Sequence, residues 1–354
     1  MSGLGQIFLE MKKKTSLSDI AKALDVSTTL VSLVLNGKAK EHRISQRMCE
    51  KVKAKAKELN YVPNHLARGL RTGKTNTLGL IVADIANPFF AKLSRAVEDE
   101  ADKHGLKVIF GSSDENAEKS AELIRIFQDR QMDGIIVAAA EKTEDQIEEL
   151  LETKTPVVLV DRYFPDLNVD LVAVDNYQAS FNAVEHLVSQ GHKRIGMIGI
   201  RGDIYHLQKR EEGFRDGLKA HGLEENDDWI RFTSSWKEFS EISEQLEHIL
   251  SSPERPTALF LAKNHLGVGA LEYFQNKGIR VPEDMAIVSF DDSETFRLAS
   301  TPVTAVEQPI EQLGREAVKL VVEKVKGKVE NKEYREVFLQ TQMLVRESSG
   351  PHED

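Results

Sequence analysis

Charged side chains that directly follow short apolar runs are the residues with which this chain could hold a small molecule. Asp161 and Arg162 follow one such run, Asp291 follows another, and residues 84–90 follow the first. If these runs are parallel strands, ligands are expected at their carboxyl ends, as in other α/β folds. Carboxylates placed there accept hydrogen bonds from ligand hydroxyls. Asp161 and Arg162 could instead form a structural ion pair with each other.

Aromatic side chains offer the flat apolar faces on which sugar rings rest. The candidates are Phe89 or Phe90, Trp236 and Phe296. Trp236 either lines the site or belongs to the hydrophobic core, and the sequence leaves both open. Together with the charged residues, these rings predict a site for a small polar ligand.

No catalytic signature accompanies these residues. Gly196, Gly199 and Gly202 follow an apolar run, but their spacing is not the G-x-G-x-x-G of dinucleotide-binding loops. The P-loop, H-E-x-x-H and G-x-S-x-G motifs are also missing from the sequence. The single cysteine, Cys49, has no histidine spaced to activate it and cannot build a multi-cysteine metal site. We therefore expect no enzyme activity, no cofactor and no metal centre.

The elements that must position the candidate residues alternate between strand and helix from residue 77 onward. The apolar runs that predict buried parallel strands lie at 78–82, 108–110, 134–137, 157–160, 195–198, 258–261 and 286–289. Helical stretches separate these runs, and the alternation starts again after Asp175. The pattern predicts two successive α/β units, each with a parallel sheet, that close on a ligand between them.

The beginning of the chain has a different, purely helical pattern. Ser16 and Asp19 have the spacing of a helix start. Ser27 is suited to cap a second short helix, which stops at Asn36-Gly37, and a third helix spans about 45–59. Two short helices joined by a three-residue turn are typical of a helix-turn-helix, whose second helix fits the DNA major groove. A three-helix bundle with no DNA role would have the same pattern.

Charge separates these two parts of the chain. The net charge is -10, yet residues 1–75 hold 15 lysines and arginines against 6 acidic residues, a net of +9. The remainder therefore carries a net charge of -19. A basic head on an acidic body indicates nucleic-acid binding by the head, although a lysine-rich helix can also be a solvated surface.

Length and composition indicate a soluble protein of more than one domain. The chain has 354 residues, of which 40% are hydrophobic and 29% charged, as in ordinary globular proteins. No run approaches the roughly 18 to 20 apolar residues that cross a bilayer. The first residues lack the charge arrangement of a secretory signal peptide. We therefore expect a cytoplasmic protein that does not enter a membrane.

An ordered series of motifs resembles the LacI/GalR (lactose-repressor) family of bacterial regulators. In the helical part the motifs are Ser-Asp-Ile-Ala-Lys-Ala-Leu-Asp-Val-Ser-Thr-Thr-Leu-Val-Ser at 18–32, Asn36-Gly37 and Asn64-x-x-Ala67-x-x-Leu70. In the remainder they are Asn87-Pro88-Phe89-Phe90, Asp161-Arg162, Val174-Asp175-Asn176, Gly191-His192-Lys193-Arg194-Ile195-Gly196, Arg210-x-x-Gly213-Phe214, Val281-Pro282-Glu283-Asp284, Ser289-Phe290-Asp291-Asp292 and Gln308-Pro309. The resemblance covers about 16–346, and its specificity lies in the order of the whole series.

The resemblance implies a fold with three regions. An all-α helix-turn-helix head spans 16–60, a hinge helix and linker span 61–76, and an α/β two-lobed body like that of periplasmic binding proteins spans 77–346. The body would bind the ligand and form the dimer.

The resemblance also implies which residues meet DNA. The candidates on and beside the recognition helix are Ser27, Thr28, Thr29, Ser32, Leu33 and Asn36. Hydroxyls at the start of this helix reach base edges, whereas Ser32 and Asn36 would touch phosphates. Leu33 stands where the family commonly has a base-reading arginine, so the family's operator sequence cannot be transferred to this chain.

A second implied DNA contact lies in the hinge, at Asn64, Ala67 and Leu70. In the family, paired hinge helices insert a leucine into a minor-groove step, which kinks the duplex. Leu70 would be that wedge here, unless it is an ordinary linker leucine.

For the ligand, the resemblance places Arg210 on a helix that faces the cleft, where it could clamp a hydroxyl or a carboxylate. Where the family often has Ala-Asn-Asp, this chain has Ala262-Lys263-Asn264. The lysine would make the pocket wall more positive and suit an acidic or phosphorylated ligand, unless Lys263 is solvated. By family habit a sugar or sugar derivative is the first expectation for the effector, and a purine the second.

These observations predict a ligand-responsive transcription regulator, a repressor, that binds a pseudo-palindromic double-stranded operator as a homodimer. One alternative is a solute-binding protein of the periplasmic type, which shares the two-lobed body. Another is a sugar- or nucleotide-processing enzyme on the same scaffold, because fold does not fix function. DNA binding separates the first prediction from both alternatives, and turnover of a bound ligand would identify the enzyme.

Overall fold

The computed structural model describes residues 15–61, 74–234, 239–327 and 334–352. The chain divides into two compact units, a head that ends at Gly73 and a body that begins at Lys74. Four of the predicted site residues lie outside the described residues: Asn64, Ala67, Leu70 and Trp236. Among the described helices, none is long and apolar enough to cross a membrane.

The head contains three capped helices: α1 (Leu17–Leu24), α2 (Thr28–Leu35) and α3 (Gln46–Glu58). Ser16 Oγ accepts the N–H of Asp19 at 3.3 Å, and the Asp19 carboxylate accepts the N–H of Ser16 at 2.8 Å. Ser27 Oγ accepts the N–H of Leu30 at 3.2 Å, which begins α2. Because such bonds satisfy N–H groups that have no partner inside the helix, they explain why both helices begin where the sequence predicts.

A small hydrophobic core holds the three helices of the head together. Ile20, Val31 and Val52 are fully buried, one from each helix. Met48 of α3 and Leu59, which caps the end of this helix, are partly buried and pack against this core. The helix-turn-helix predicted from the spacing is therefore present, with α2 as its second helix.

Lobe 1 of the body is built on a six-stranded parallel sheet in the order β11-β5-β4-β3-β1-β2. Its strands are β1 (Thr77–Val82), β2 (Lys107–Ser112), β3 (Gly134–Val137), β4 (Val157–Val160), β5 (Asp170–Val174) and β11 (Glu336–Leu339). Its helices are α5 (Pro88–Lys103), α6 (Ala117–Asp129), α7 (Glu144–Leu151) and α13 (Ile310–Val325). Leu80 packs in the core under α5 and α13, and its neighbour Ile81 packs in the core under α6 and α7. Both faces of the sheet are therefore covered, as parallel strands require.

Lobe 2 has a second six-stranded sheet, in the order β12-β10-β9-β8-β6-β7. Its strands are β6 (Ile195–Ile200), β7 (Ile230–Thr233), β8 (Ala258–Leu261), β9 (Ala286–Phe290), β10 (Thr304–Glu307) and β12 (Gln342–Leu344). Its helices are α8 (Asn176–Ser189), α9 (Tyr205–Ala220), α10 (Phe239–Ser251), α11 (Asn264–Lys277), α12 (Glu294–Leu298) and the short 3-10 helix η1 (Glu347–Ser349). β12 runs antiparallel to β10, so the expectation of a purely parallel second sheet is wrong at this edge.

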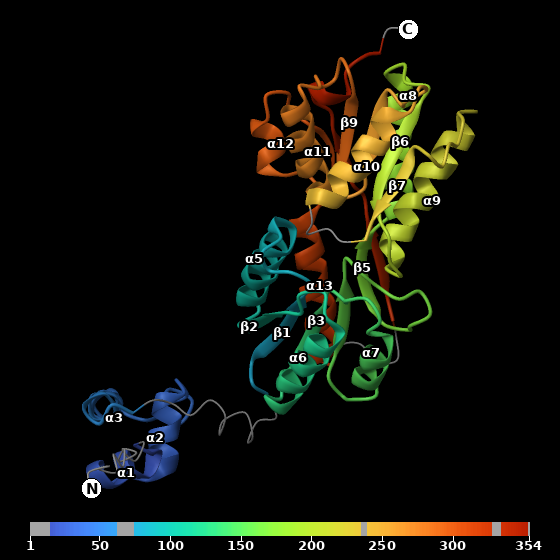
Figure 1. The fold of residues 1–354 in the computed structure, drawn as a ribbon. Coiled ribbons are helices and arrows are strands. Elements are labelled where there is room, and N and C mark those ends of the chain that lie inside the picture. Colours follow the sequence, from blue (N-terminus) through green and yellow to red (C-terminus); the bar gives the residue numbers. More distant parts are fainter. Residues whose placement is uncertain (1–14, 62–73, 235–238, 328–333, 353–354) are drawn as a thin grey trace, which may run out of the picture. The chain divides into compact units, whose positions relative to one another are not determined.

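The two lobes are interleaved, which corrects the prediction of two successive units. Within the described residues, the chain passes between the lobes after β5, after β10 and after β11. Figure 1 shows the late helix α13 lying among the early elements α5, β1 and β3. The returning strands β11 and β12 are edge strands with partly exposed residues, so they lack the continuous apolar run from which strands were predicted.

A buried ion pair fixes the returning helix in lobe 1. Lys324 Nζ of α13 lies 2.7 Å from Asp170 Oδ2 at the start of β5, and the two side chains are 3% and 0% exposed. The other carboxylate oxygen accepts the N–H of Arg335, just before β11, at 2.9 Å. One carboxylate thus joins three segments that meet only because the chain crosses between the lobes.

Replacing Lys324 by methionine should lower the free energy of unfolding by about 3 to 5 kcal/mol, because it leaves the Asp170 charge buried without its partner. Lys319→Met is the matched control on the same helix, where Lys319 pairs with Glu316 near the surface. That change should cost less than about 1 kcal/mol. Urea unfolding of both variants measures the difference. Equally small losses would show that the buried pair does not hold α13.

Candidate functional site

A pocket lies where the carboxyl ends of strands from both lobes meet. It is lined by Asn87, Phe89, Phe90, Asp161, Arg162, His206, Arg210, Lys263, Asp291 and Gln308. These residues follow β1, β4, β6, β8, β9 and β10 along the chain. Of the nine ligand residues singled out from the sequence, seven line this pocket, Phe296 does not, and Trp236 lies outside the described residues. We call it the strand-end pocket.

Asp161 and Asp291 occupy equivalent places in the two lobes. Each follows a central strand with φ of 66°, and each donates its N–H to the neighbouring strand at 2.9 Å, to Val172 O and to Val306 O respectively. Aspartate tolerates this left-handed conformation better than most residues. The side chain of Gln308 donates from Nε2 to Asp291 Oδ1 at 2.7 Å. Burial raises the pKa of Asp161 to about 6, while the nearby Arg162 and Arg210 partly oppose the shift.

Arg162 is paired mainly with Glu115, a residue that sequence reasoning missed. Its Nη1 and Nη2 donate to the two carboxylate oxygens of Glu115 at 2.5 and 2.6 Å. Its Nε lies 3.8 Å from Asp161 Oδ2, and its guanidinium carbon lies 5.4 Å from the centre of the Phe90 ring. The ion pair with Asp161 that the sequence left open is thus present, and the shorter, two-pronged contact with Glu115 is added to it.

The buried guanidinium of Arg210 connects three elements of lobe 2. Its Nε donates to Asn176 Oδ1 at the start of α8, and its Nη1 donates to the carbonyl of Ala262 after β8, both at 2.8 Å. Its central carbon lies 3.4 Å from the ring centre of Phe290, the last residue of β9. Burial lowers the pKa of Arg210, but a guanidinium stays charged at any physiological pH.

The position of Arg210 depends on a glycine one turn further along α9. A Cβ on Gly213 would lie 2.1 Å from the carbonyl oxygen of Tyr177 on α8, so only glycine lets the two helices approach so closely. The motif that pairs Arg210 with Gly213 therefore has a physical basis. Gly213 allows α9 to pack closely against α8, and this packing places Arg210 of α9 at the pocket.

Lys263 lies directly between β8 and α11, at the N-cap position of that helix. Its side chain lines the strand-end pocket and the residue is only 8% exposed, so the alternative of a solvated lysine is wrong. Burial lowers its pKa to about 8, and the positive charge of Arg162 adds to this shift. The pocket wall thus contains a lysine whose charge is costly to keep.

Several buried polar atoms of this pocket have no hydrogen-bond partner within the described residues. They are Arg162 Nε, His206 Nδ1 and Gln308 Oε1. Burial keeps the pKa of His206 well below its usual range, so its ring is neutral. Unsatisfied buried polar groups are rare in proteins, and a group of them in one pocket indicates a place where a polar ligand completes the bonding.

Sequence reasoning missed His206 and Gln308 as lining residues, and it included Asn87 only within the range 84–90. Asn87 and Gln308 belong to motifs that resembled the family, yet neither was singled out as a ligand contact. β10, which precedes Gln308, mixes Thr304 and Glu307 with apolar residues and gave no strand signal. Nothing in the sequence around His206 marks it.

Phe296 does not belong to the pocket, which corrects its prediction as a sugar-stacking face. It belongs to α12, and its side chain is fully buried in the core of lobe 2. Its ring lies so close to Gly267 of α11 that a Cβ there would come within 2.5 Å of it. Phe89 and Phe90, by contrast, both line the pocket and meet edge to face with ring centres 5.0 Å apart.

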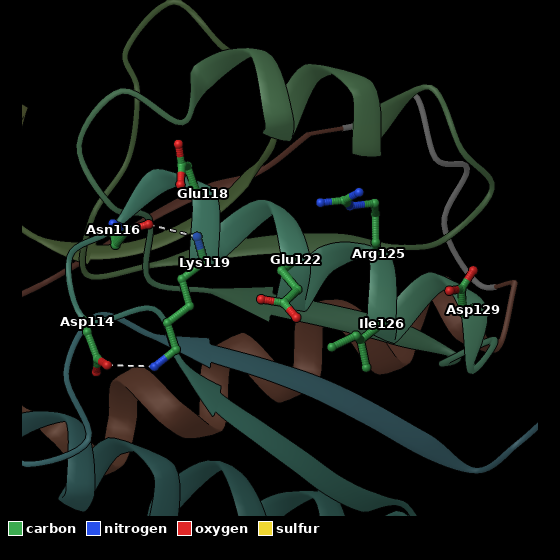
Figure 2. A pocket seen from close by; sticks show the side chains of 8 residues that line it. All are labelled: Asp114, Asn116, Glu118, Lys119, Glu122, Arg125, Ile126 and Asp129. Atoms are coloured by element: carbon green, nitrogen blue, oxygen red, sulfur yellow. Dashed lines mark hydrogen bonds and ion pairs between the residues drawn. The ribbon is translucent and has the colours of Figure 1, made fainter.

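A wider hollow lies on the outside of lobe 1 along α6. It is lined by Asp114, Asn116, Glu118, Lys119, Glu122, Arg125, Ile126 and Asp129. Figure 2 shows these side chains along α6 and the turn before it, and Lys119 Nζ donates to Asp114 Oδ2 at 2.6 Å. None of the buried atoms without a partner, among the described residues, belongs to this hollow. We therefore take the narrower strand-end pocket as the candidate site for a small molecule.

The recognition helix presents hydroxyls at its beginning. Ser27, Thr28 and Thr29 are exposed, although Ser27 Oγ is engaged in capping α2. Asn36 Nδ2 at the other end donates to Ser32 O at 2.7 Å and to Ser32 Oγ at 3.2 Å, so these two predicted phosphate contacts are bonded to each other. Leu33, which replaces the family's base-reading arginine, is half buried.

Asp161→Asn should stabilise the protein at neutral pH, because asparagine keeps the left-handed backbone and removes a buried charge. The folded pKa of about 6 exceeds the ordinary 3.8, so the stability contributed by Asp161 is present below about pH 4 and is lost as the pH rises to 6. The gain should be about 2 to 3 kcal/mol at pH 7.5 and should shrink as the pH falls toward 4. Urea unfolding across this range measures it, with the exposed Asp166→Asn as control. A gain that stays constant with pH would contradict the charge argument.

Comparisons with known proteins agree with this arrangement. Residues 16–64 match the family model described as bacterial regulatory proteins, lacI family, and residues 184–349 match a periplasmic binding protein-like domain. The chain is 32% identical over 304 residues to catabolite control protein A of Priestia megaterium, which covers 86% of this chain and 90% of that protein. It is 31% identical over 333 residues to the ribose operon repressor of Haemophilus influenzae, which covers 94% of this chain and 98% of that protein.

Solved structures show the same fold. The lac repressor dimer bound to operator superposes with a TM-score of 0.83 at 21% identity, over 96% of this chain and 100% of that chain. The transcriptional regulator CelR in its cellobiose complex superposes with a TM-score of 0.70 at 28% identity, over 95% of this chain and 100% of that chain. The curated relatives are transcriptional regulators rather than enzymes. The chain belongs to the LacI family of bacterial regulatory proteins.

Proposed function

We propose that this protein is a repressor that binds operator DNA through its head and changes its DNA affinity when a small effector enters the strand-end pocket. The observation that carries the proposal is the combination, in one chain, of the helix-turn-helix with a polar pocket that contains buried polar atoms without hydrogen-bond partners. A free-standing solute-binding protein has no use for the basic head. The protein would act in the cytoplasm, where the operator DNA lies.

The exposed Thr28 and Thr29 at the start of α2 are the proposed base readers. Their hydroxyls can donate to or accept from base edges, and their methyl groups suit thymine. Ser27, Ser32, Leu33 and Asn36 would flank this contact. Asn64, Ala67 and Leu70 would form the hinge contact in the minor groove, with Leu70 as the apolar wedge.

The proposed effector is a sugar or sugar derivative, with a purine as the second candidate. Asp161 and Asp291 would accept hydrogen bonds from hydroxyls, and the rings of Phe89 and Phe90 provide apolar faces beside them. Among the relatives, one is named for the ribose operon and one is solved with cellobiose. Arg210 would bind a ligand oxygen through the guanidinium nitrogen that the protein leaves unused.

Selection of bound fragments from random double-stranded DNA tests the regulator directly. We expect enrichment of one sequence with two-fold symmetry, because two heads read two half-sites. Replacing Thr29 by alanine should weaken binding to that sequence by about 1 kcal/mol or more while leaving binding to scrambled DNA nearly unchanged. Fluorescence anisotropy with both DNAs measures this. Absence of enrichment for the folded dimer, with and without pooled sugars and purines, would reject the proposal.

We further propose that the homodimer forms through exposed apolar side chains on the body. Ile109 and Phe110 of the edge strand β2 are 41% and 56% exposed, and Leu298 at the end of α12 is 85% exposed. Large apolar side chains grouped on an edge strand are a liability unless something covers them. A second copy of the chain is the partner that a two-fold operator requires.

Phe110→Glu should therefore convert the dimer to a monomer, because it places a charge in the apolar contact. Phe338→Glu is a matched control, since Phe338 is 43% exposed on β11 at the opposite edge of the same sheet. Light scattering after size-exclusion chromatography reads the mass of each variant. A Phe338 variant that is monomeric, or a Phe110 variant that remains dimeric, would contradict an interface at Phe110.

A further inference from the structure

Arg162 lines the strand-end pocket, yet most of its guanidinium is bound to a residue outside the lining. Its Nη1 and Nη2 donate to the two carboxylate oxygens of Glu115 at 2.5 and 2.6 Å, and Nη1 also donates to the carbonyl of Ala139 at 3.4 Å. The side chain of Arg162 is 3% exposed and that of Glu115 is 19% exposed. A two-pronged contact between an arginine and a carboxylate fixes the plane of the guanidinium as well as its position. Glu115 therefore determines where Arg162 lies in the pocket.

The consequence of this contact is seen at Asp161, the residue directly before Arg162. Asp161 Oδ2 lies 3.8 Å from Arg162 Nε, which is close enough for an ion pair but too long for a hydrogen bond. Within the described residues, the Asp161 carboxylate accepts no hydrogen bond and Arg162 Nε donates none. Asp291, the equivalent residue of lobe 2, is by contrast bound by Gln308 at 2.7 Å. Of the two aspartates, Asp161 thus keeps both carboxylate oxygens for a ligand.

The turn that presents Glu115 has an unfavourable backbone conformation. Asp114 and Glu115 have φ of 52° and 59°, so two consecutive residues with side chains lie in the left-handed region. Aspartate is among the residues enriched there, but glutamate is not. The turn is fixed by its surroundings, because the N–H of Glu115 donates to the carbonyl of Ala83 at 3.1 Å and Asn116 accepts the N–H of Lys119 at 2.8 Å, at the start of α6. Backbone strain that the surrounding structure enforces is typical of functional sites.

The charges around Asp161 show what a closer contact with Arg162 would change. Burial raises the pKa of Asp161 to about 6, and Arg162 is the charge that opposes this shift most. The other charges that act on Asp161 are Arg210, Lys263 and Asp291, of which only Asp291 raises the pKa. A direct bond from an arginine lowers the pKa of an aspartate by about one to three units. Because both Nη groups are engaged elsewhere, Arg162 acts on Asp161 only across the longer distance from Nε.

We propose that Glu115 is a positioning residue of the effector site, which holds the guanidinium of Arg162 away from Asp161 and so keeps the Asp161 carboxylate available to a ligand hydroxyl. Glu115 lies outside the lining of the pocket, so it acts through Arg162 and not on the ligand itself. Without Glu115, the carboxylate that remains beside the buried guanidinium is that of Asp161. The two would then form a closed pair that competes with the ligand. This inference rests on the proposed function of the pocket as the effector site.

The test follows the titration of Asp161 in the full-length protein without ligand. Carbon-13 NMR of protein labelled on the aspartate carboxyl groups reports the pKa, and the Asp161→Asn variant identifies the signal. Glu115→Gln should lower the pKa of Asp161 from about 6 to below about 5, because Arg162 then bonds to it. Glu115→Asn should do the same, and asparagine suits the left-handed backbone, so this variant keeps the turn if glutamine disturbs it. Glu118→Gln is the matched control, since it removes the charge of an exposed residue on α6, and it should leave the pKa of Asp161 unchanged.

A second comparison shows whether the effect passes through Arg162. In an Arg162→Met background, adding Glu115→Gln should leave the pKa of Asp161 nearly unchanged, because the group that would turn toward Asp161 is absent. Urea unfolding shows that each variant folds cooperatively. A fall of the pKa as large as in the presence of Arg162 would show a direct effect of the Glu115 charge instead of positioning.

Three results would overturn the inference: a pKa of Asp161 that stays near 6 in both Glu115 variants, an equal fall in the Glu118 control, or an effect that survives without Arg162. Operator selection, measured separately, distinguishes this failure from failure of the proposed function. If the wild type selects a two-fold-symmetric operator but Asp161 does not respond to Glu115, the regulator stands and the role of Glu115 falls. If the pKa falls as expected but no operator is selected, the positioning of Arg162 stands and the regulator falls.

Discussion

Parallel strand pairing is the constraint from which the body's architecture and its pocket both follow. A parallel strand must be followed by a crossover, so the parallel strands of each sheet all begin at one end of the sheet and the chain leaves them at the other end. The residues after β1, β4, β8, β9 and β10 are therefore collected at the carboxyl edges of the two sheets, where the pocket forms. Asp161 and Asp291 show that the same constraint gives both lobes the same local geometry. They share the same φ and the same bond to a neighbouring strand, although they lie in different lobes.

In the absence of a ligand, the polar groups buried in this pocket lower the stability of the folded protein. Burial raises the pKa of Asp161 and lowers those of Lys263 and His206, so the charged form of each of these groups is less stable in the pocket than in water. Glu115 compensates the buried charge of Arg162, although Glu115 itself does not line the pocket. Perturbed pKa values of this kind gather at functional sites. A protein gives up stability at such a site in order to bind its ligand.

The sequence predicted the parts of this structure that depend on local pattern. The capped helices of the head and the central strands of both sheets have strong periodicity, and seven of the predicted ligand residues meet in one pocket. The interleaving of the lobes was missed because α13 and β11 join lobe 1 through tertiary contacts such as Lys324 with Asp170, which leave no local signal. His206, Glu115 and Gln308 were missed for the same reason. Their importance comes from partners on other elements, and Phe296 was misplaced because an aromatic residue looks alike in a core and in a pocket.

A contact at the start of the body bears on how the pocket could act on the head. The Asp133 carboxylate, just before β3, accepts the N–H of Thr75 at 2.7 Å and the N–H of Asn76 at 2.9 Å. The first residues of the body are thus fixed to lobe 1, and any displacement of lobe 1 carries them along. A ligand shifts such an equilibrium only by the difference in its affinity for the two arrangements. The affinity of a ligand in the strand-end pocket would depend on the arrangement of the lobes, because Asp161 belongs to lobe 1 whereas Arg210 and Asp291 belong to lobe 2. In the proposed regulator, a ligand held by both lobes would favour one spacing between them, and the bonds from Asp133 would keep Thr75 and Asn76 with lobe 1 as that spacing changes.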